Sequence, residues 1–435
     1  MRLLTIVSDL RPGGTQRVAC NFARAYAESG VESALFAYRG GGALENSLGN
    51  PVDLFVGGPG DPEQQMALAA ALRWKPDVVH VHREGPADPR TAAFLRAVKS
   101  AGREASAAPV GVMETNVFGR VDYSVDARHI DVHFLLSRWC LWKWRRWGSL
   151  ASQPLGIVLP NLVMHGDFTP IQPGLRAQFR ARWQIPSAAL LFGRIGSPIE
   201  SKWSRETLDA FAAHAAQNPD SWLLLVAIPA ALRERLTALP ERIRSRVVVI
   251  DFLHGDAALR EAYGSMDVFL HSAQIGESFG MVLAESLLCG TPVITLSTPA
   301  KDNSQLEVVG HEHGGLVAAS LSGMIDAMSR LRNAAERERY ARLGAASIVE
   351  RYGPQALIPT ALAVASLCAE GLPRSQLRRR VLALPGICSD IPTADIRALM
   401  HRSLGKYPLG TPALLHLVSS PLLYRAYRAV KTLSQ

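Results

Sequence analysis

Short apolar runs alternate with amphipathic helical stretches along this sequence, and the alternation stops once and then starts again. The first series of runs lies at 3–7, 33–38, 77–81, 110–113 and 132–136. The second series lies at 190–195, 222–228, 247–250, 268–271 and 293–296. Strands that alternate with helices form parallel sheets covered by helices on both faces. The sequence therefore predicts an α/β chain built from two doubly wound parallel sheets.

A polar, proline-containing connector at 160–173 separates the two series. We place the domain boundary there, with a first domain at 1–165 and a second at 166–349. The length of 435 residues suits two domains of ordinary size. Doubly wound sheets bind ligands at the carboxyl ends of their strands, so two such sheets that face each other would enclose a cleft.

The positive charge of the chain is concentrated near its end. The chain carries a net charge of +9, and residues 371–435 hold ten basic residues against two acidic ones, a net charge of +8. We expect this region to be a basic tail or a helical extension. A nucleic-acid partner is not expected, because no recognition motif accompanies the charge.

Five scattered cysteines without a Cys-x-x-Cys pair favour a reduced, cytoplasmic chain. The apolar run after Met1 is short and lacks a cleavage site, so we interpret it as a first strand instead of a signal peptide. No run of about 18 apolar residues predicts a membrane-spanning helix.

The most specific motif begins after the run at 268–271, where a loop leads into a helix that ends at Gly290-Thr291-Pro292. Glu277 lies in this loop and Glu285 lies eight positions later on the helix. A carboxylate can accept hydrogen bonds from both hydroxyls of a sugar diol. The small residues Ser278 and Gly280 let backbone N–H groups approach a ligand, and a helix N-terminus favours phosphate. The simpler interpretation is an exposed loop glutamate and a surface helical glutamate.

This segment resembles the signature of retaining GT-B glycosyltransferases of glycosyltransferase family 4, also called glycosyl transferases group 1. The resemblance covers about 1–368 and implies two Rossmann-like domains facing a cleft, with 350–370 crossing back onto the first domain. It implies that Glu285 holds the ribose of the sugar donor and that Glu277 faces the transferred sugar. The backbone of the following residues would bind the sugar and the phosphates: Ser278, Phe279, Gly280, Met281 and Val282.

Arg194 and Lys202 follow the first strand of the second domain, where the family has two cations that grip the diphosphate. Positive charge there stabilises the leaving group as the glycosidic bond breaks. The chain has no Asp-x-Asp pair of the kind that holds a divalent cation. We therefore expect no metal and no other cofactor, with the nucleotide sugar as a substrate.

Further positions are assigned through the resemblance. Gly13 and Gly14 match the glycine loop that opens onto the cleft, and Phe252 and Leu253 match the border of the nucleobase pocket. His82 would face the acceptor, although a strand-end histidine bonded to a nearby loop is an equal alternative. The family's usual histidine after the next strand is missing, and Glu114 or Asn116 could take its place.

These features predict a retaining, metal-independent hexosyltransferase. It would move a sugar from a UDP- or GDP-sugar to a glycan or a lipid-linked acceptor, as in polysaccharide biosynthesis. The alternatives are a non-catalytic glycosyltransferase-like protein of polysaccharide assembly and a GT-B epimerase or phosphorylase.

Two segments suggest peripheral contact with the inner face of the membrane. Residues 138–147 interleave four tryptophans with four cations, and the basic region 371–435 mixes cations with apolar residues. Tryptophan favours the headgroup region and basic residues favour anionic lipid. Tryptophans that belong to the core, and an accessory helical subdomain, explain the same two segments equally well.

Overall fold

The computed structural model describes residues 1–49, 51–104, 109–147 and 154–401, together with Ala413, Leu417, Ser420, Leu422, Leu423 and Ala426. The chain divides into two compact units. The first consists of Met1–Val163, Tyr352–Pro392 and Ser420–Gln435. The second consists of Met164–Arg351 and Thr393–Ser419.

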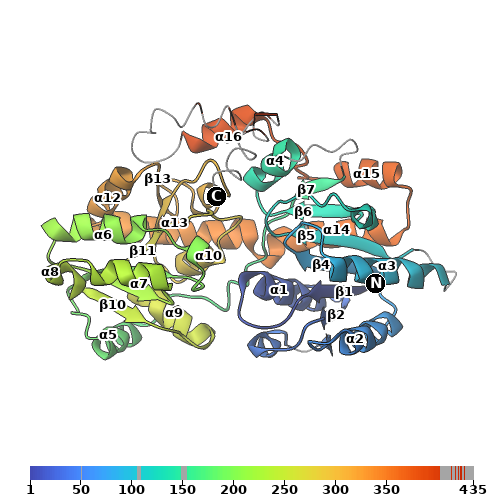
Figure 1. The fold of residues 1–435 in the computed structure, drawn as a ribbon, viewed down its shortest axis with the longest axis horizontal. Coiled ribbons are helices and arrows are strands. Elements are labelled where there is room, and N and C mark those ends of the chain that lie inside the picture. Colours follow the sequence, from blue (N-terminus) through green and yellow to red (C-terminus); the bar gives the residue numbers. More distant parts are fainter. Residues whose placement is uncertain are drawn as a thin grey trace. The chain divides into compact units, whose positions relative to one another are not determined.

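The first unit is a seven-stranded parallel sheet with the strand order β3-β2-β1-β4-β5-β6-β7 (Figure 1). Its strands are β1 Arg2–Val7, β2 Glu32–Ala37, β3 Val52–Val56, β4 Val78–Arg83, β5 Gly111–Asn116, β6 Val132–Leu135 and β7 Gly156–Val158. Its helices are α1 Gly14–Glu28, α2 Asp61–Arg73, α3 Pro89–Glu104, α4 Arg138–Trp147, α14 Pro354–Ala369 and α15 Arg374–Leu382, with short 3-10 turns η1 Ala43–Ser47 and η2 Val125–His129.

Alternation along β2 shows why helices cover both faces of this sheet. Leu35 packs in a cluster with Ala19 of α1, whereas the next residue, Phe36, packs in a second cluster with Leu68 of α2 and Phe94 of α3. Successive side chains of a strand point to opposite faces, so a strand buried on both faces is apolar throughout.

The second unit is a six-stranded parallel sheet with the order β10-β9-β8-β11-β12-β13. Its strands are β8 Leu190–Ile195, β9 Ser221–Val226, β10 Val247–Ile250, β11 Val268–His271, β12 Val293–Leu296 and β13 Gly315–Ala318. Its helices are α5 Pro173–Arg182, α6 Glu206–Gln217, α7 Ala230–Thr237, α8 Glu241–Arg244, α9 Gly255–Ser265, α10 Met281–Leu288, α11 Gln305–Val309, α12 Leu321–Arg330, α13 Ala334–Tyr352 and α16 Thr393–Met400, with the 3-10 turn η3 Glu200–Lys202.

Both sheets reverse their strand order at one point, between β1 and β4 in the first unit and between β8 and β11 in the second. Such a reversal leaves a crevice outside the carboxyl ends of the two strands, where ligands bind. The predicted fold class, two doubly wound parallel-sheet units, is therefore confirmed. The apolar runs predicted most of the strands, but β3, β7 and β13 were not predicted.

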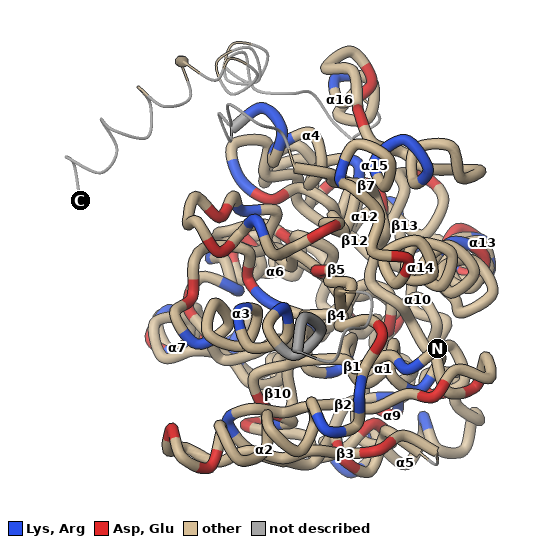
Figure 2. Tube along the Cα trace, turned by 90° about the vertical axis from the view of Figure 1, so that its right-hand side faces the viewer, with Lys and Arg blue, Asp and Glu red and all other residues tan. Residues whose placement is uncertain are grey.

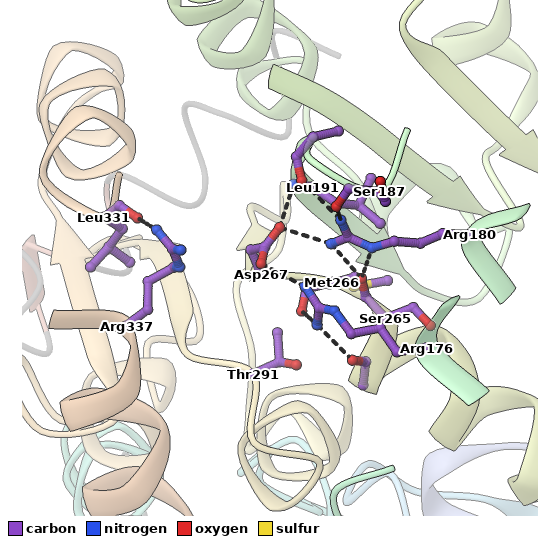
Figure 3. Close-up of polar contacts among 12 residues, drawn as sticks. Arg176, Arg180, Ser187, Leu191, Ser265, Met266, Asp267, Thr291, Leu331 and Arg337 are labelled. Atoms are coloured by element: carbon purple, nitrogen blue, oxygen red, sulfur yellow. Dashed lines mark hydrogen bonds and ion pairs between the residues drawn. The ribbon is translucent and has the colours of Figure 1, made fainter. Parts of the chain in front are cut away.

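A charged network fixes the amino ends of β8 and β11 (Figure 3). Asp267, just before β11, accepts hydrogen bonds from Arg176 at 2.6 Å and Arg180 at 2.9 Å, both on α5. The same carboxylate accepts from the backbone N–H of Leu191 at 2.7 Å. Charge-assisted bonds of this kind hold the two strands in register, which also sets the positions of their carboxyl ends.

The structure favours one of the two interpretations of the tryptophan-rich helix α4 for three of its tryptophans. Ser137 caps it as the sequence indicates, since its hydroxyl accepts from the backbone N–H of Cys140 at 2.9 Å. However, Trp139, Trp142 and Trp144 are at most 3 % exposed. These three side chains belong to the core of the first unit, because burying large aromatic surfaces outweighs placing them in water. They are therefore not available to a membrane surface.

The basic region forms two helices in the part that the structure describes. α15 carries Arg374, Arg378, Arg379 and Arg380 (blue in Figure 2), and α16 follows it. Most of the chain beyond residue 401 lies outside the described residues.

One stretch, Ala334–Ala369, is long and apolar enough to cross a membrane by length and composition. It contains α13 and α14, and half of its most apolar window is buried within the protein. Core helices of soluble proteins share these properties. In α14, Cys368 packs so closely on β5 that a Cβ at Gly111 would lie 2.7 Å from it.

Candidate active site

Arg194 lies one residue before the end of β8 and is 1 % exposed. Its guanidinium lies 5.0 Å from the ring centre of Trp203 and 5.6 Å from that of Phe269. Nη2 donates to the backbone carbonyl of Lys202 at 2.9 Å, and Nε has no hydrogen-bond partner among the described residues. Burial lowers the pKa of Arg194 to about 10 despite the nearby Glu277, so the side chain stays positively charged at neutral pH.

Glu277 lies in the loop after β11 and is 5 % exposed. Its Oε2 accepts from Lys202 Nζ at 3.1 Å, and its backbone N–H donates to Gln305 Oε1 at 3.2 Å. Burial favours the neutral acid, but Lys202, His271 and Arg194 outweigh burial and hold the pKa of Glu277 well below its usual value. Glu277 is therefore a carboxylate surrounded by cations and donors.

His271, the last residue of β11, orients this carboxylate. Its Nε2 lies 3.2 Å from Glu277 Oε1, and its Nδ1 lies 2.9 Å from Thr295 Oγ1. A carboxylate can only accept, so Nε2 carries the proton and Nδ1 accepts from the threonine hydroxyl. Burial, followed by the charge of Arg194, lowers the pKa of His271 to about 4. The imidazole is thus a neutral donor at pH 7.

The loop that carries Glu277 contains two glycines with left-handed backbone. Gly276 has φ 68° and Gly280 has φ 92°. A Cβ at Gly276 would lie 1.7 Å from the carbonyl oxygen of Asp302, so only glycine fits there. Gly280 is the N-cap of α10, and the buried residues Ser278 and Phe279 precede it. Met281 and Val282, in the first turn of α10, are partly exposed.

Glu285 lies on the second turn of α10 and is 5 % exposed. The hydroxyl of Tyr263, on α9, donates to its Oε2 at 3.0 Å. Burial and the charge of Glu285 raise the pKa of Tyr263 well above its usual value, so the tyrosine remains a donor. Phe252 and Leu253 follow β10; Phe252 is 52 % exposed and lies beside His254.

Three predicted residues of the first unit lie after β1 or near the end of β4, the two strands between which the strand order of its sheet reverses. Gly13 and Gly14 follow β1 and form the exposed start of α1. His82 is near the end of β4, 3 % exposed, with neither ring nitrogen hydrogen-bonded to a described residue. Its ring lies 4.3 Å from that of His80 and 5.6 Å from that of Phe22, and burial lowers the pKa of His82 to about 3. In the structure His82 is therefore not hydrogen-bonded to a described residue of a nearby loop.

Glu114 and Asn116, the two substitutes for the missing histidine, are both engaged elsewhere. Glu114 is fully buried, forms an ion pair with Arg83 at 2.5 Å and is hydrogen-bonded to His133. Asn116 donates to the carbonyl of Arg120 at 2.7 Å and accepts from its N–H at 3.1 Å. Neither side chain is presented for acid–base chemistry in this arrangement.

The structure thus brings Arg194, Lys202 and Glu277 together at the carboxyl ends of β8 and β11. Three residues of this site were not predicted from the sequence: His271, Thr295 and Tyr263. His271, the last residue of β11, and Thr295, one residue before the end of β12, are register partners. Strand register was therefore the signal that could have found them. Among the described residues no three His, Cys, Asp or Glu side chains are grouped so that they could hold a metal ion.

Comparisons with known proteins match segments of both units. The family described as glycosyl transferases group 1 matches residues 187–334, and glycosyltransferase family 4 matches residues 12–103. A phosphatidyl-myo-inositol mannosyltransferase of Mycobacterium leprae is 32% identical over 212 residues, 48% of this chain and 52% of that protein. The match thus spans about half the length of that relative.

Solved structures share the fold over most of the chain. HepE of Anabaena, solved with UDP and glucose, has a TM-score of 0.63 at 17% identity, covering 84% of this chain and 99% of that one. A sucrose-phosphate synthase from Thermosynechococcus elongatus has a TM-score of 0.59 at 18% identity, covering 88% and 99%. Two parallel-sheet units with these neighbours define the GT-B fold. The two family matches together cover just over half of the chain, which belongs to the group 1, or family 4, glycosyltransferases.

Proposed function

We propose that this protein transfers a hexose from a nucleotide-diphosphate sugar to a glycan or lipid-linked acceptor, with retention of configuration and without a metal. The observation that supports it most is the convergence of Arg194 and Lys202 on Glu277 at the reversal point of the second sheet. Two buried or half-buried cations beside a helix N-terminus suit a diphosphate. Glu285, held by Tyr263, suits the ribose diol.

The reaction needs little from side-chain bases. The acceptor hydroxyl attacks the anomeric carbon on the face from which the diphosphate departs, and the departing phosphate oxygen takes the hydroxyl proton. Arg194 and Lys202 stabilise the charge on the leaving group, and Glu277 positions the sugar. This route fits a chain whose Glu114 and Asn116 are engaged in other contacts and whose His82 is buried.

A lipid-linked acceptor is favoured by the name of the mycobacterial relative, which acts on phosphatidyl-myo-inositol. The corresponding location is the cytoplasm, at the inner face of the membrane. The buried tryptophans of α4 do not contribute to such contact, so the charged region after residue 371 would supply it.

The test is turnover with a panel of UDP- and GDP-sugars, with and without EDTA, and determination of the product anomer by NMR. We expect one donor to be consumed, activity to survive EDTA and the anomeric configuration to be kept. Donor binding without turnover on any acceptor would instead support a non-catalytic assembly protein. Activity abolished by EDTA and restored by manganese would refute the metal-free mechanism.

A further inference from the structure

A cavity in the first unit lies outside the residues assigned above. Its volume is ≈ 560 Å³, in the range of small-ligand sites. Its wall combines the loop between β5 and β6, the start of β6, the end of α4, the residues before β7 and the helix α15. All of these segments belong to the first unit.

α15 closes this cavity from a part of the chain that the family resemblance does not explain. Arg374 donates to the backbone carbonyls of Arg128 and Ile130, in the loop before β6. After α15, the chain runs beside β7, where the N–H of Val158 donates to the carbonyl of Cys388 at 2.8 Å. Figures 1 and 2 both show α15 next to β7. The basic helix is therefore a built part of the first unit.

The cavity wall carries an excess of positive charge. Asp122 and Asp131 also line it, but Asp122 forms an ion pair with Arg83 at 2.9 Å and Asp131 forms one with Lys99 at 2.8 Å. Because these two carboxylates are already neutralised, three lining arginines set the charge of the cavity: Arg128, Arg374 and Arg378. A planar guanidinium binds two oxygens of one phosphate group.

The rest of the wall is mostly apolar or aromatic, with three polar residues, Ser124, His133 and Ser375. Trp144 is almost fully buried, whereas Tyr123 and Val125 are 65 % and 74 % exposed on the opposite loop. His133 lies 5.3 Å from Trp144 between ring centres and is 3 % exposed. Its Nδ1 bonds Glu114, while its Nε2 is buried without a hydrogen-bond partner among the described residues. A buried nitrogen in this state indicates a ligand or water that supplies the partner.

We propose that this cavity binds a phosphate ester that carries an apolar or aromatic group. Arg374 and Arg378 hold the phosphate, and Tyr123 and Trp144 contact the apolar group. A soluble phosphate monoester and the headgroup of an acidic phospholipid both offer this chemistry. The inference uses no residue of the donor site, so it does not depend on the proposed transfer reaction.

The first experiment titrates phenyl phosphate into the full-length protein by calorimetry. We expect binding that Arg378→Ala weakens at least about tenfold, as expected for a lost charge-assisted hydrogen bond. Arg379→Ala is the matched control, since Arg379 lies next to it on α15 and does not line the cavity. Its affinity should equal that of the unchanged protein. Equal affinities for Arg378→Ala and Arg379→Ala, or no binding by the unchanged protein, would overturn the proposal.

A second variant keeps the test decisive if Arg378→Ala fails to fold, as judged by circular dichroism and melting. Tyr123 is mostly exposed, so Tyr123→Ala should fold normally. It should weaken the binding of phenyl phosphate but not that of inorganic phosphate, because only the ester carries a ring. An unchanged affinity for phenyl phosphate would contradict the assigned wall.

The two sources of the phosphate are separated with vesicles. Vesicles of phosphatidylcholine with phosphatidic acid should capture the protein in an Arg378-dependent way if the ligand is a lipid headgroup. Binding of phenyl phosphate without capture by these vesicles identifies a soluble ester instead. Capture that Arg378→Ala and Arg379→Ala reduce equally, without binding of phenyl phosphate, would show only general surface charge and would overturn the site.

Discussion

Each unit of this protein buries one carboxylate between a cation and a histidine. In the second unit Glu277 lies between Lys202 and His271, and in the first unit Glu114 lies between Arg83 and His133. The two clusters differ in their place along the strand. Glu277 follows the end of β11, whereas Glu114 lies inside β5 and pairs with His133 in the middle of the sheet.

That difference in place decides what each cluster can do. Side chains beyond the carboxyl end of a strand reach the crevice where ligands bind, and the Lys202 side chain is 27 % exposed. Glu114 lies within a covered strand and its side chain is 0 % exposed, and its partner Arg83, at the end of β4, is 7 % exposed. A cation, a carboxylate and a histidine therefore form a candidate site in one unit and a structural frame in the other.

The largest effect should follow the loss of Lys202. Lys202→Ala should lower kcat by about 10²–10³-fold, or ~3–4 kcal/mol, because the cation acts on charge that develops in the transition state. Donor affinity should change much less. Arg205→Ala, which removes a cation that is 71 % exposed three residues away, is the control for general charge. Equal losses of kcat in both variants would remove Lys202 from the site.

Breaking the sealed cluster should instead reduce stability. Glu114→Ala leaves Asp122, 2.9 Å away, as the remaining charged partner of buried Arg83 among the described residues. Removing one member of a buried ion pair lowers the free energy of unfolding by about 3–5 kcal/mol. Because Asp122 still pairs with Arg83, we expect a loss of about 3 kcal/mol. Urea unfolding measures this loss. If Glu114→Ala unfolds at the same urea concentration as the unchanged protein, Glu114 is not part of a structural frame.

Glu285 should have a moderate effect that is confined to nucleotide binding. Glu285→Ala removes the carboxylate that Tyr263 holds on α10, and a lost buried acceptor for charged hydrogen bonds is worth about 1.5–3 kcal/mol, or tenfold and upward in affinity. Calorimetry with UDP and GDP measures it. Tyr263→Phe should have a smaller effect in the same direction. Unchanged affinities for both nucleotides would refute the ribose assignment.

The sequence predicted the second unit's site better than the first unit's cluster, for a physical reason. Residues 277–285 form a local motif, and the loop, glycines and helix that position Glu277 are neighbours in sequence. Arg83, Glu114 and His133 meet only through the pairing of β4, β5 and β6, which no local pattern reveals.

The local sequence pattern also did not predict which side chains of α4 are buried. α4 alternates tryptophans with cations in a way that suits a surface helix, yet Trp139, Trp142 and Trp144 lie in the core. Which face of a helix is buried depends on the elements around it. The predicted strands at 190–195, 247–250 and 268–271 needed only apolar runs, and the structure has these same boundaries.

The smallest expected effect is on the pH dependence of stability, and it concerns His82 of the first unit in comparison with His271 of the second. His271 is neutral within a hydrogen-bonded chain, whereas His82 is neutral among aromatic rings with no bonded partner among the described residues. Burial places the pKa of His82 at about 3 in the folded protein, below the ordinary value of 6.5. Between these values the unfolded chain binds a proton that the folded chain does not. Stability is therefore lost as pH falls below about 6.5, at about 1.4 kcal/mol per pH unit.

His82→Phe should remove this contribution. At pH 7.5 the variant should match the unchanged protein within about 1 kcal/mol, since an unpartnered polar ring is replaced by an apolar one of similar shape. At pH 5.5 it should be the more stable by about 1.4 kcal/mol, because it no longer has a histidine to protonate on unfolding. Chemical unfolding at the two pH values measures both, with the exposed His313→Phe as a control that leaves the pH dependence unchanged. The outcome that would contradict this is an equal loss of stability by His82→Phe and the unchanged protein between pH 7.5 and 5.5. A ligand or water partner would then keep the pKa of His82 near its ordinary value, and the surroundings of His82 would be as polar as those of His271.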